Sequence, residues 1–250
     1  MTRRETVQIG SGLLPVIRVS PDVEDRSLVT TLATAGLPLQ TPVVVLIGGA
    51  GGLEPPERLV CARFFADALV PVLEKTGAIL VDGGTAAGIM ALAGKARRDA
   101  GAAGPHVGVV AEGTVNWPGR PERPDAAELD ANHTHVVLVP GDTWGDESPW
   151  LSKIATALAG SARSVTVLAN GGPIAYDDVR QSLNAGRPVL VLAGTGRTAA
   201  AIAAARAGSG DDPRAAEIAA SPLVSIVHDD PAELVAQLTG LLRSDLGRRR

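Results

Sequence analysis

The sequence predicts an α/β fold with a Rossmann-like, doubly wound and mostly parallel sheet of about seven strands and helices on both faces. Two observations lead to this prediction. Short β-branched runs alternate with Gly-rich turns and Ala/Leu-rich stretches of helical length, which is the pattern of βαβ units. The β-branched runs are continuously apolar rather than alternating, as in strands that are covered on both faces.

Seven runs are predicted strands, and six stretches beside them have the length and composition of helices. The strands are expected at 43–47, 78–81, 106–110, 135–139, 164–168, 188–192 and 223–227. The helices are expected at about 56–75, 86–100, 149–160, 174–185, 198–207 and 231–243. Pro149 and Pro231 stand at helix starts, where Ser148 and Asp230 are the expected N-caps.

The two ends and one internal segment depart from this pattern. Within 1–40, short strands at 6–9 and 15–19 and a weak helix at 22–35 are expected to extend the sheet. Segment 113–131 is rich in Pro and charge and too long for an ordinary connection, so it is predicted to be a functional or mobile loop. Residues 246–250 form a basic tail. Without an internal repeat or a long linker, residues 1–250 are predicted to form one domain.

Composition excludes several classes of protein. The 250-residue chain is 45% hydrophobic and 20% charged, which excludes a disordered chain. Its net charge of −4 argues against a nucleic-acid partner. No apolar run reaches the ~18–20 residues of a membrane span, and no apolar leader is visible, so a cytoplasmic location is expected. The single cysteine, Cys61, excludes a disulfide framework and is expected in the core.

Gly-rich turns follow the predicted strands, at the sheet edge where open α/β folds bind ligands. Glycine lets backbone amides approach a phosphate closely, and a following helix N-terminus favours an anion. A tight turn alone also needs glycine, but several such turns at one edge favour a phosphorylated ligand. The expected ligand-binding residues are Gly48, Gly49, Gly51, Gly83, Gly84, Thr85, Gly88, Glu112, Gly113, Thr114, His133, Gly141, Asp142, Gly171, Gly172, Pro173, Asp178, Gly194, Gly196 and Arg197.

Three other features of the sequence could have a functional role. The G-x-G-x-x-A run at 194–199 fits a dinucleotide fingerprint, but no acidic residue follows about 20 residues later, which argues against a dehydrogenase. His133 and His135 could share a metal, yet no third ligand accompanies them, so no metal site is predicted. Three tryptophans lie in or beside loops at the ligand edge, where one could stack on a base; they are Trp117, Trp144 and Trp150.

Five segments, taken in order, carry a resemblance to a known family. They are DGGTAAGIM at 82–90, GVVAEGTV at 108–115, LDANHTHVVLV at 129–139, NGGP at 170–173 and NAGRPVLVLAGTGRTA at 184–199. Together they resemble the SLOG superfamily, and within it the LSDAT group, which includes the SLOG domains of TRPM-type channels and their prokaryotic relatives. The resemblance implies a Rossmann-like domain that binds nucleotide-derived molecules, with ADP-ribose-type ligands as the leading class.

The chain is more distantly similar to the Lonely Guy phosphoribohydrolases. Their G-G-G-x-x-G-x-M loop is matched loosely at 83–90, whereas their P-G-G-x-G-T-x-x-E loop keeps only Gly171 and Gly172. Asp178 stands where that loop has its catalytic Glu, and it is one methylene shorter. Cleavage of a glycosidic bond needs an accurately placed carboxylate, so the resemblance implies that this activity is lost or changed.

Three functions therefore stay open. The preferred prediction is a sensor that binds a ligand of the ADP-ribose or NAD class without turnover and without a cofactor, with phosphates at Gly83–Thr85 and Gly171–Pro173. The alternative is an enzyme that cleaves an N-glycosidic bond with Asp178 or Glu112. The third is an interaction scaffold. The expected partners are the small molecule, a second copy of the chain in a homodimer or larger oligomer, and possibly a separate effector protein, with no nucleic acid or membrane.

Overall fold

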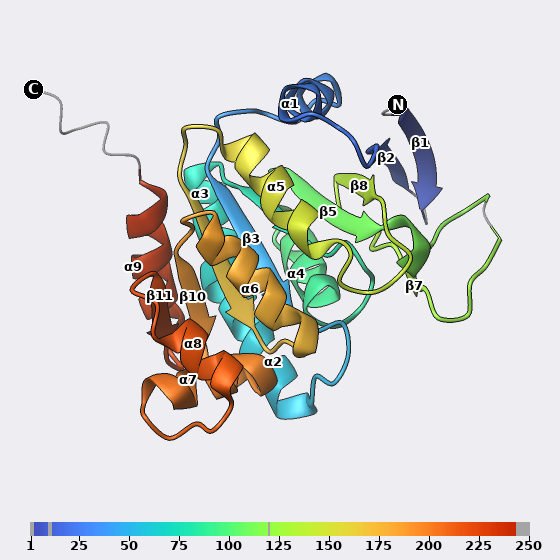
Figure 1. Cartoon of the computed structure of the whole chain (residues 1–250). Coiled ribbons are helices and arrows are strands. Elements are labelled where there is room, and N and C mark those ends of the chain that lie inside the picture. Colours follow the sequence, from blue (N-terminus) through green and yellow to red (C-terminus); the bar gives the residue numbers. More distant parts are fainter. Residues whose placement is uncertain (1–2, 10–11, 120, 244–250) are drawn as a thin grey trace, which may run out of the picture.

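A single mixed sheet runs through the computed structural model, which describes residues 3–9, 12–119 and 121–243 (Figure 1). Its nine strands lie in the order β1-β2-β8-β5-β4-β3-β9-β10-β11. They span Arg3–Ile9 (β1), Gly12–Arg18 (β2), Val43–Gly48 (β3), Ile79–Asp82 (β4), His106–Ala111 (β5), His135–Val139 (β8), Ser164–Ala169 (β9), Val189–Leu192 (β10) and Val224–Val227 (β11). All neighbouring strands are parallel except β1 and β2.

The predicted fold class is confirmed, and the sheet is larger than the seven strands expected. Each of the seven predicted runs forms a strand within one residue or so of its predicted bounds. The two additional strands, β1 and β2, come from the N-terminal segments that were expected to extend the sheet, and β2 pairs with β8. The basic tail at 246–250 lies outside the described residues.

Helices cover both faces of the sheet. They span Asp25–Thr34 (α1), Pro55–Phe64 (α2), Val70–Thr76 (α3), Gly88–Asp99 (α4), Ser148–Ala159 (α5), Pro173–Asn184 (α6), Arg197–Arg206 (α7), Pro213–Ala219 (α8) and Pro231–Leu242 (α9). Helices α1, α5, α6, α7 and α8 pack on one apolar cluster, and α2, α3, α4 and α9 pack on another behind the sheet (Figure 1). Within the described residues, no helix combines the length and the apolar character needed to cross a bilayer.

The helix predicted at 56–75 is interrupted by a π-turn, Phe65–Leu69, between α2 and α3. Pro71 lies in the first turn of α3. Proline lacks an amide hydrogen, and its ring clashes with the carbonyl four residues earlier, so a regular α-helix cannot continue through it. The π-turn widens the helix at this point and keeps it continuous.

Two helix starts test the expected N-caps. Asp230 caps α9, because its carboxylate accepts a hydrogen bond from the Ala232 amide at 2.9 Å. Ser148 does not cap α5; it is the first helical residue, and Glu147 occupies the N-cap position. The helix therefore begins one residue earlier than expected, and this places Glu147 at the strand-end edge of the sheet.

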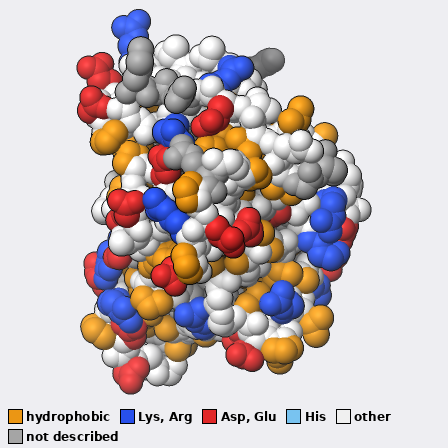
Figure 2. Space-filling model, turned by 90° about the vertical axis from the view of Figure 1, so that its right-hand side faces the viewer, with side chains coloured by type: hydrophobic (Ala, Val, Ile, Leu, Met, Phe, Trp, Pro, Cys, Tyr) orange, Lys and Arg blue, Asp and Glu red, His pale blue; other side chains and the backbone are white. Residues whose placement is uncertain are grey.

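The long segment 113–131 lies against the sheet near β2, β5 and β8. It contains two short strands, Val115–Asn116 (β6) and Ala127–Glu128 (β7), which pair with each other. Trp117 anchors the segment, because it is only 7% exposed and packs in a cluster with residues of β2 and β8. On the described part of the face shown in Figure 2, acidic and basic side chains are interspersed, so this face offers nucleic acid no continuous basic surface.

The strand order reverses at the centre of the sheet. From β3 the chain adds β4, β5 and β8 on one side, and then places β9 on the other side of β3, followed by β10 and β11. The connections leaving β3 and β9 therefore diverge to opposite faces, which opens a crevice at the carboxyl ends of these two strands.

Candidate ligand-binding cleft

A cleft of about 340 Å³ occupies this reversal point. Residues at the carboxyl ends of β3, β4, β8 and β9 contribute to it, together with the first turns of α5, α6 and α7. Its lining consists of Leu46, Ile47, Gly48, Gly49, Ala50, Gly51, Gly52, Gly83, Thr85, Met90, Trp144, Glu147, Leu151, Gly172, Pro173, Ile174, Ala175, Asp178 and Arg197.

The glycine loops after β3 and β4 are in direct backbone contact. The amide of Ile89, in the first turn of α4, donates a hydrogen bond to the carbonyl of Gly49 at 3.1 Å. Gly88 has a φ of +50°, and a Cβ at this position would overlap the same Gly49 carbonyl oxygen. Only glycine at position 88 lets these two segments approach this closely, and any larger residue would push the loop after β3 away from α4.

Arg197 joins the loops after β3, β9 and β10. Its Nη1 donates to the carbonyl of Gly51 at 2.6 Å. The guanidinium also lies against Gly52 and Gly172, where an added Cβ would come within 2.8 Å and 3.1 Å of it. Among the described residues, no carboxylate lies within ion-pair distance of Arg197. The cleft therefore presents a cation whose charge is not neutralised by a neighbouring acid.

Asn170 fixes the other side of these loops. It is fully buried with a φ of +60°. Its amide nitrogen donates to Thr195 O at 2.9 Å and to Glu57 Oε2 at 3.1 Å, which connects the end of β9 to the loop after β10 and to α2. Its Oδ1 has no hydrogen-bond partner among the described residues and points toward Gly49.

Two half-buried carboxyl groups, Asp178 on α6 and Glu147 at the start of α5, line the same cleft. Desolvation raises the pKa of Asp178 to about 7, and the nearby charge of Glu147 adds to the rise. The Ser148 hydroxyl beside Asp178 opposes that rise. Desolvation also raises the pKa of Glu147. Two acids that are reluctant to ionise together can accept hydrogen bonds from hydroxyl groups or move a proton.

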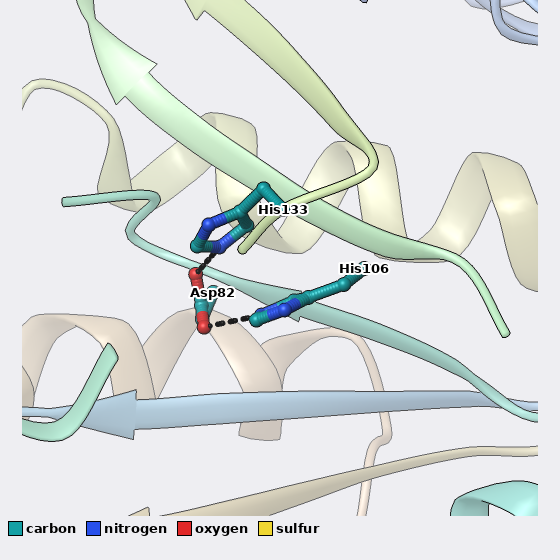
Figure 3. Close-up of side chains that lie close together, drawn as sticks. All are labelled: Asp82, His106 and His133. Atoms are coloured by element: carbon teal, nitrogen blue, oxygen red, sulfur yellow. Dashed lines mark hydrogen bonds and ion pairs between the residues drawn. The ribbon is translucent and has the colours of Figure 1, made fainter. Parts of the chain in front are cut away.

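A second polar cluster lies beneath the loop after β4 (Figure 3). Asp82, at the end of β4, faces two imidazoles: its Oδ1 lies 2.7 Å from His133 Nε2 and its Oδ2 lies 2.8 Å from His106 Nε2. All three side chains are fully buried. Desolvation by burial would raise the pKa of Asp82, but the charges and hydrogen bonds of His133 and His106 outweigh it and lower that pKa. Desolvation and the nearby His133 charge lower the pKa of His106 to about 4.

The same three side chains have the composition of a metal site. Their ligand atoms lie within 4.8 Å of one another, and two imidazoles with one carboxylate are suitable zinc donors. In a complex through Nε2, His106 would carry its proton on Nδ1, but this buried atom has no hydrogen-bond partner among the described residues. The geometry therefore fits a hydrogen-bonded ion cluster better than a metal centre.

Comparison with known proteins identifies the family. The model of a family described as "SLOG in TRPM, prokaryote" (LSDAT) matches residues 41–236. This chain belongs to that family.

Individual relatives of this LSDAT chain are distant. It is 27% identical to transient receptor potential cation channel subfamily M member 2 of Mus musculus over 75% of this chain, and 25% identical to the Rattus norvegicus protein over 67%. The matches cover 15% and 13% of those channels, so the chain spans a small part of their length. A molybdenum cofactor binding protein from Rippkaea orientalis shares the fold, with a TM-score of 0.54, 13% identity and coverage of 81% of this chain and 98% of that one.

The predicted site residues of this LSDAT chain divide into three groups. The cleft is lined by Gly48, Gly49, Gly51, Gly83, Thr85, Gly172, Pro173, Asp178 and Arg197. Neighbouring turns that support it contain Gly84, Gly88, Gly171, Gly194 and Gly196. The remaining predicted residues do not line it; they are Glu112, Gly113, Thr114, His133, Gly141 and Asp142.

Glu112 is the notable member of the third group. It forms an ion pair with Arg18 at 3.0 Å and lines a separate hollow with Trp117 and Arg123. Glu147, which the sequence reasoning missed, supplies the second carboxyl group of the main cleft instead. One signal was available: Glu147 follows the Gly-rich loop after β8 and directly precedes a helix start. Of the three tryptophans only Trp144 lines the cleft, with 42% of its surface exposed.

Proposed function

We propose that this LSDAT chain binds a nucleotide-derived molecule of the ADP-ribose or NAD class in the cleft between β3 and β9, and that it acts as a sensor without turnover. The observation that carries the proposal is Arg197, an arginine without an acidic partner among the described residues, held between glycine loops at the reversal point of the sheet. This combination suits a phosphate or pyrophosphate group.

The other lining groups support the remaining parts of such a ligand. Asp178 and Glu147 offer oxygen atoms that suit ribose hydroxyl groups. Trp144 offers an exposed ring on which a base can stack. The apolar remainder of the lining, including Leu46, Met90 and Ile174, excludes water around these contacts.

Calorimetric titration with ADP-ribose, NAD, AMP and ATP tests the proposal. Arg197→Gln removes the cation and should weaken binding of the best ligand at least about tenfold, because a charge-assisted hydrogen bond is lost. Arg206→Gln is the matched control, since Arg206 lies at the other end of α7 and bonds the carbonyls of Ser221 and Val224. Absence of heat with all four compounds would refute the proposal.

A second candidate, hydrolysis of an N-glycosidic bond, is favoured by the paired carboxyl groups. With a pKa of about 7, Asp178 can donate a proton to the departing base, while the Glu147 carboxylate takes a proton from the water that adds to the ribose C1′. Chromatography of the protein incubated overnight with AMP or NAD distinguishes hydrolysis from binding without turnover. Free base that disappears with Asp178→Asn supports the enzyme, and intact ligand supports the sensor.

A homodimer or larger oligomer, a separate effector protein and a cytoplasmic location are also part of this proposal. A ligand sensor has to pass its occupancy to another chain, and that requires a protein contact. Light scattering during size exclusion, with and without ADP-ribose, measures the oligomeric state. A monomer under both conditions would contradict the expected self-association.

A further inference from the structure

The hydrogen-bond partners of His133 define its charge. Its Nε2 lies 2.7 Å from the Asp82 carboxylate and its Nδ1 lies 3.1 Å from the Asp130 carbonyl oxygen. An ionised carboxylate and a peptide carbonyl only accept hydrogen bonds, so both ring nitrogens must carry a proton. His133 is therefore an imidazolium, and opposite charges meet in a fully buried pair with Asp82.

His106 has the opposite character. Its Nε2 donates to the second oxygen of Asp82 at 2.8 Å, and its Nδ1 has no partner among the described residues. Its ring lies 3.8 Å from that of His133, measured between ring centres, so a second positive charge there would be strongly repelled. The cluster thus holds one carboxylate, one imidazolium and one neutral imidazole.

Other charged groups also face this cluster. Asp130 Oδ2 lies 3.8 Å from His133 Nδ1 and favours the imidazolium. Arg97 on α4 interacts with Asp82 and disfavours a charge on His106, and Arg97 itself lies 3.9 Å from Glu74 on α3. Despite desolvation, Asp82 and Asp130 together raise the pKa of His133 above its ordinary value of 6.5.

The ion pair connects directly to the cleft through Gly84. The Gly84 amide donates to Asp82 Oδ1 at 2.8 Å, and the Gly84 carbonyl accepts from the Asp130 amide at 3.0 Å. Gly84 has a φ of +67°, and an added Cβ would lie 2.8 Å from the side chain of Val110, so this turn has little room to move. Its two neighbours, Gly83 and Thr85, line the cleft.

We propose that the buried Asp82–His133 ion pair is a positioning device that holds the Gly83–Thr85 turn in its ligand-binding conformation and couples ligand affinity to the protonation of His133. The coupling to affinity rests on the proposed binding function; the charge state and the anchoring of the turn do not. When His133 loses its proton at alkaline pH, Asp82 loses its counter-charge, the turn loosens and affinity falls. By linkage, the ligand raises the pKa of His133 in return.

Two measurements on the unliganded protein test the charge and the anchoring. Side-chain nitrogen NMR of the wild type at pH 7 should show both ring nitrogens of His133 protonated and only Nε2 of His106. Hydrogen exchange at the Gly84 amide should accelerate at least about tenfold in His133→Gln, because the turn opens more often. A singly protonated His133 at pH 7, or unchanged exchange at Gly84, would overturn the inference.

Calorimetry with ADP-ribose from pH 6 to pH 9.5 tests the coupling. Wild-type affinity should fall about tenfold across the titration of His133. His133→Gln and the isosteric Asp82→Asn should bind weakly and keep only the change around pH 7 that the cleft residue Asp178 causes. His135→Asn is the control, because His135 bonds Thr134 and Ala35 outside this cluster, and it should keep the wild-type profile. Flat wild-type affinity would refute the coupling. Absence of binding at every pH would refute the proposed function. The charge of His133 and the anchoring of the Gly83–Thr85 turn would then be judged by the NMR and hydrogen-exchange measurements alone.

Discussion

Asp178 and Arg187 are both ionisable groups in poorly hydrated surroundings, but their partners differ. Asp178 lies beside another acid, Glu147. Arg187 is 2% exposed and directs all its N–H groups at oxygen atoms of neighbouring elements, with no carboxylate among its hydrogen-bond partners in the described residues. The ionised form of Asp178 therefore lowers the stability of the folded protein. Arg187, in contrast, links the helices and the strand around it through its hydrogen bonds.

Asp178→Asn should stabilise the protein at alkaline pH. The folded state holds the Asp178 proton up to a pKa of about 7, whereas the unfolded chain releases it near 3.8, so folding stability falls as pH rises between these values. Removing the ionisable group should add about 2 kcal/mol to the free energy of unfolding at pH 8 and almost nothing at pH 4. Urea denaturation at both pH values measures the difference.

Asp177→Asn is the matched control for that experiment. Asp177 is exposed on the same helix and pairs with Arg180 at 3.1 Å. Its replacement should change stability by less than about 0.5 kcal/mol at either pH. An equal gain from Asp178→Asn at pH 4 and pH 8 would contradict desolvation of the Asp178 carboxylate.

Arg187→Lys should destabilise the fold even though the charge is kept. Arg187 donates to Ser152 and Thr156 on α5, Ser182 on α6 and Ser164 on β9. Lysine has a single charged nitrogen and cannot reach all of these groups, so buried hydroxyls lose their partner. We expect a loss of about 2–3 kcal/mol in urea denaturation.

Arg206→Lys provides the comparison for Arg187→Lys. Arg206 is exposed at the end of α7, where its guanidinium bonds two backbone carbonyls. Its replacement should cost less than about 0.5 kcal/mol. Equal losses at the two positions would show that the network around Arg187 does not stabilise the fold.

At the scale of elements, the start of α4 is tightly constrained by the loop after β3. Gly88 begins α4 with a positive φ and meets the Gly49 carbonyl, so helix and neighbouring loop have to be placed together. The other end of α4 is different. Gly101 also has a positive φ, +64°, but an added Cβ there would meet nothing within 4 Å.

Replacement of these two glycines separates backbone strain from steric contact. Gly101→Ala should cost about 1 kcal/mol, which is the strain of a left-handed conformation alone. Gly88→Ala carries the same strain and a backbone overlap, so it should cost about 3 kcal/mol or more. Thermal denaturation of both variants measures the difference, and equal costs would show that the loop at Gly49 moves away freely.

Most helices and strands could be predicted because local signals define them. Continuous Val/Ile/Leu runs gave the strands, and Pro231 with its Asp230 cap gave the start of α9. The π-turn at Phe65–Leu69 could not be predicted, since it depends on how the helix accommodates Pro71 while packing on the sheet. The short helix α8 was not predicted either, because its seven residues are too few for a clear periodic pattern.

At the scale of the whole molecule, the cleft depends on strand order. The sequence predicts Gly-rich turns at one edge, but it does not state which turns become neighbours. Because β3 lies between β4 and β9, the loops after these strands meet, whereas Glu112, after β5, pairs with Arg18 of β2 on the other side of the sheet edge. Glu147 and Asp178 come together through the packing of α5 on α6, which no short-range pattern reveals.

Ligand binding should therefore be visible in the intrinsic fluorescence of the whole protein. Trp144 is the tryptophan that lines the cleft, whereas Trp117 is buried elsewhere and Trp150 packs against the core. ADP-ribose at a hundredfold excess over its Kd should change the emission and add about 2.7 kcal/mol to the stability of the native state.

The tryptophan variants assign that signal. Trp144→Phe should lose the change in emission, and Trp150→Phe should keep it. A ligand-induced change that survives in Trp144→Phe would place the ligand away from this cleft.

The central position of β3 has a consequence for synthesis of the chain. One edge of β3 pairs with β4, which is close to it in sequence, but the other edge pairs with β9, residues 164–169, which are synthesised much later. Until then a row of apolar residues with unpaired backbone groups lies open in the nascent chain, as a template for association with other chains. We expect the yield of folded protein to depend on whether chaperones bind the chain during this interval. The stability of the finished sheet should matter less.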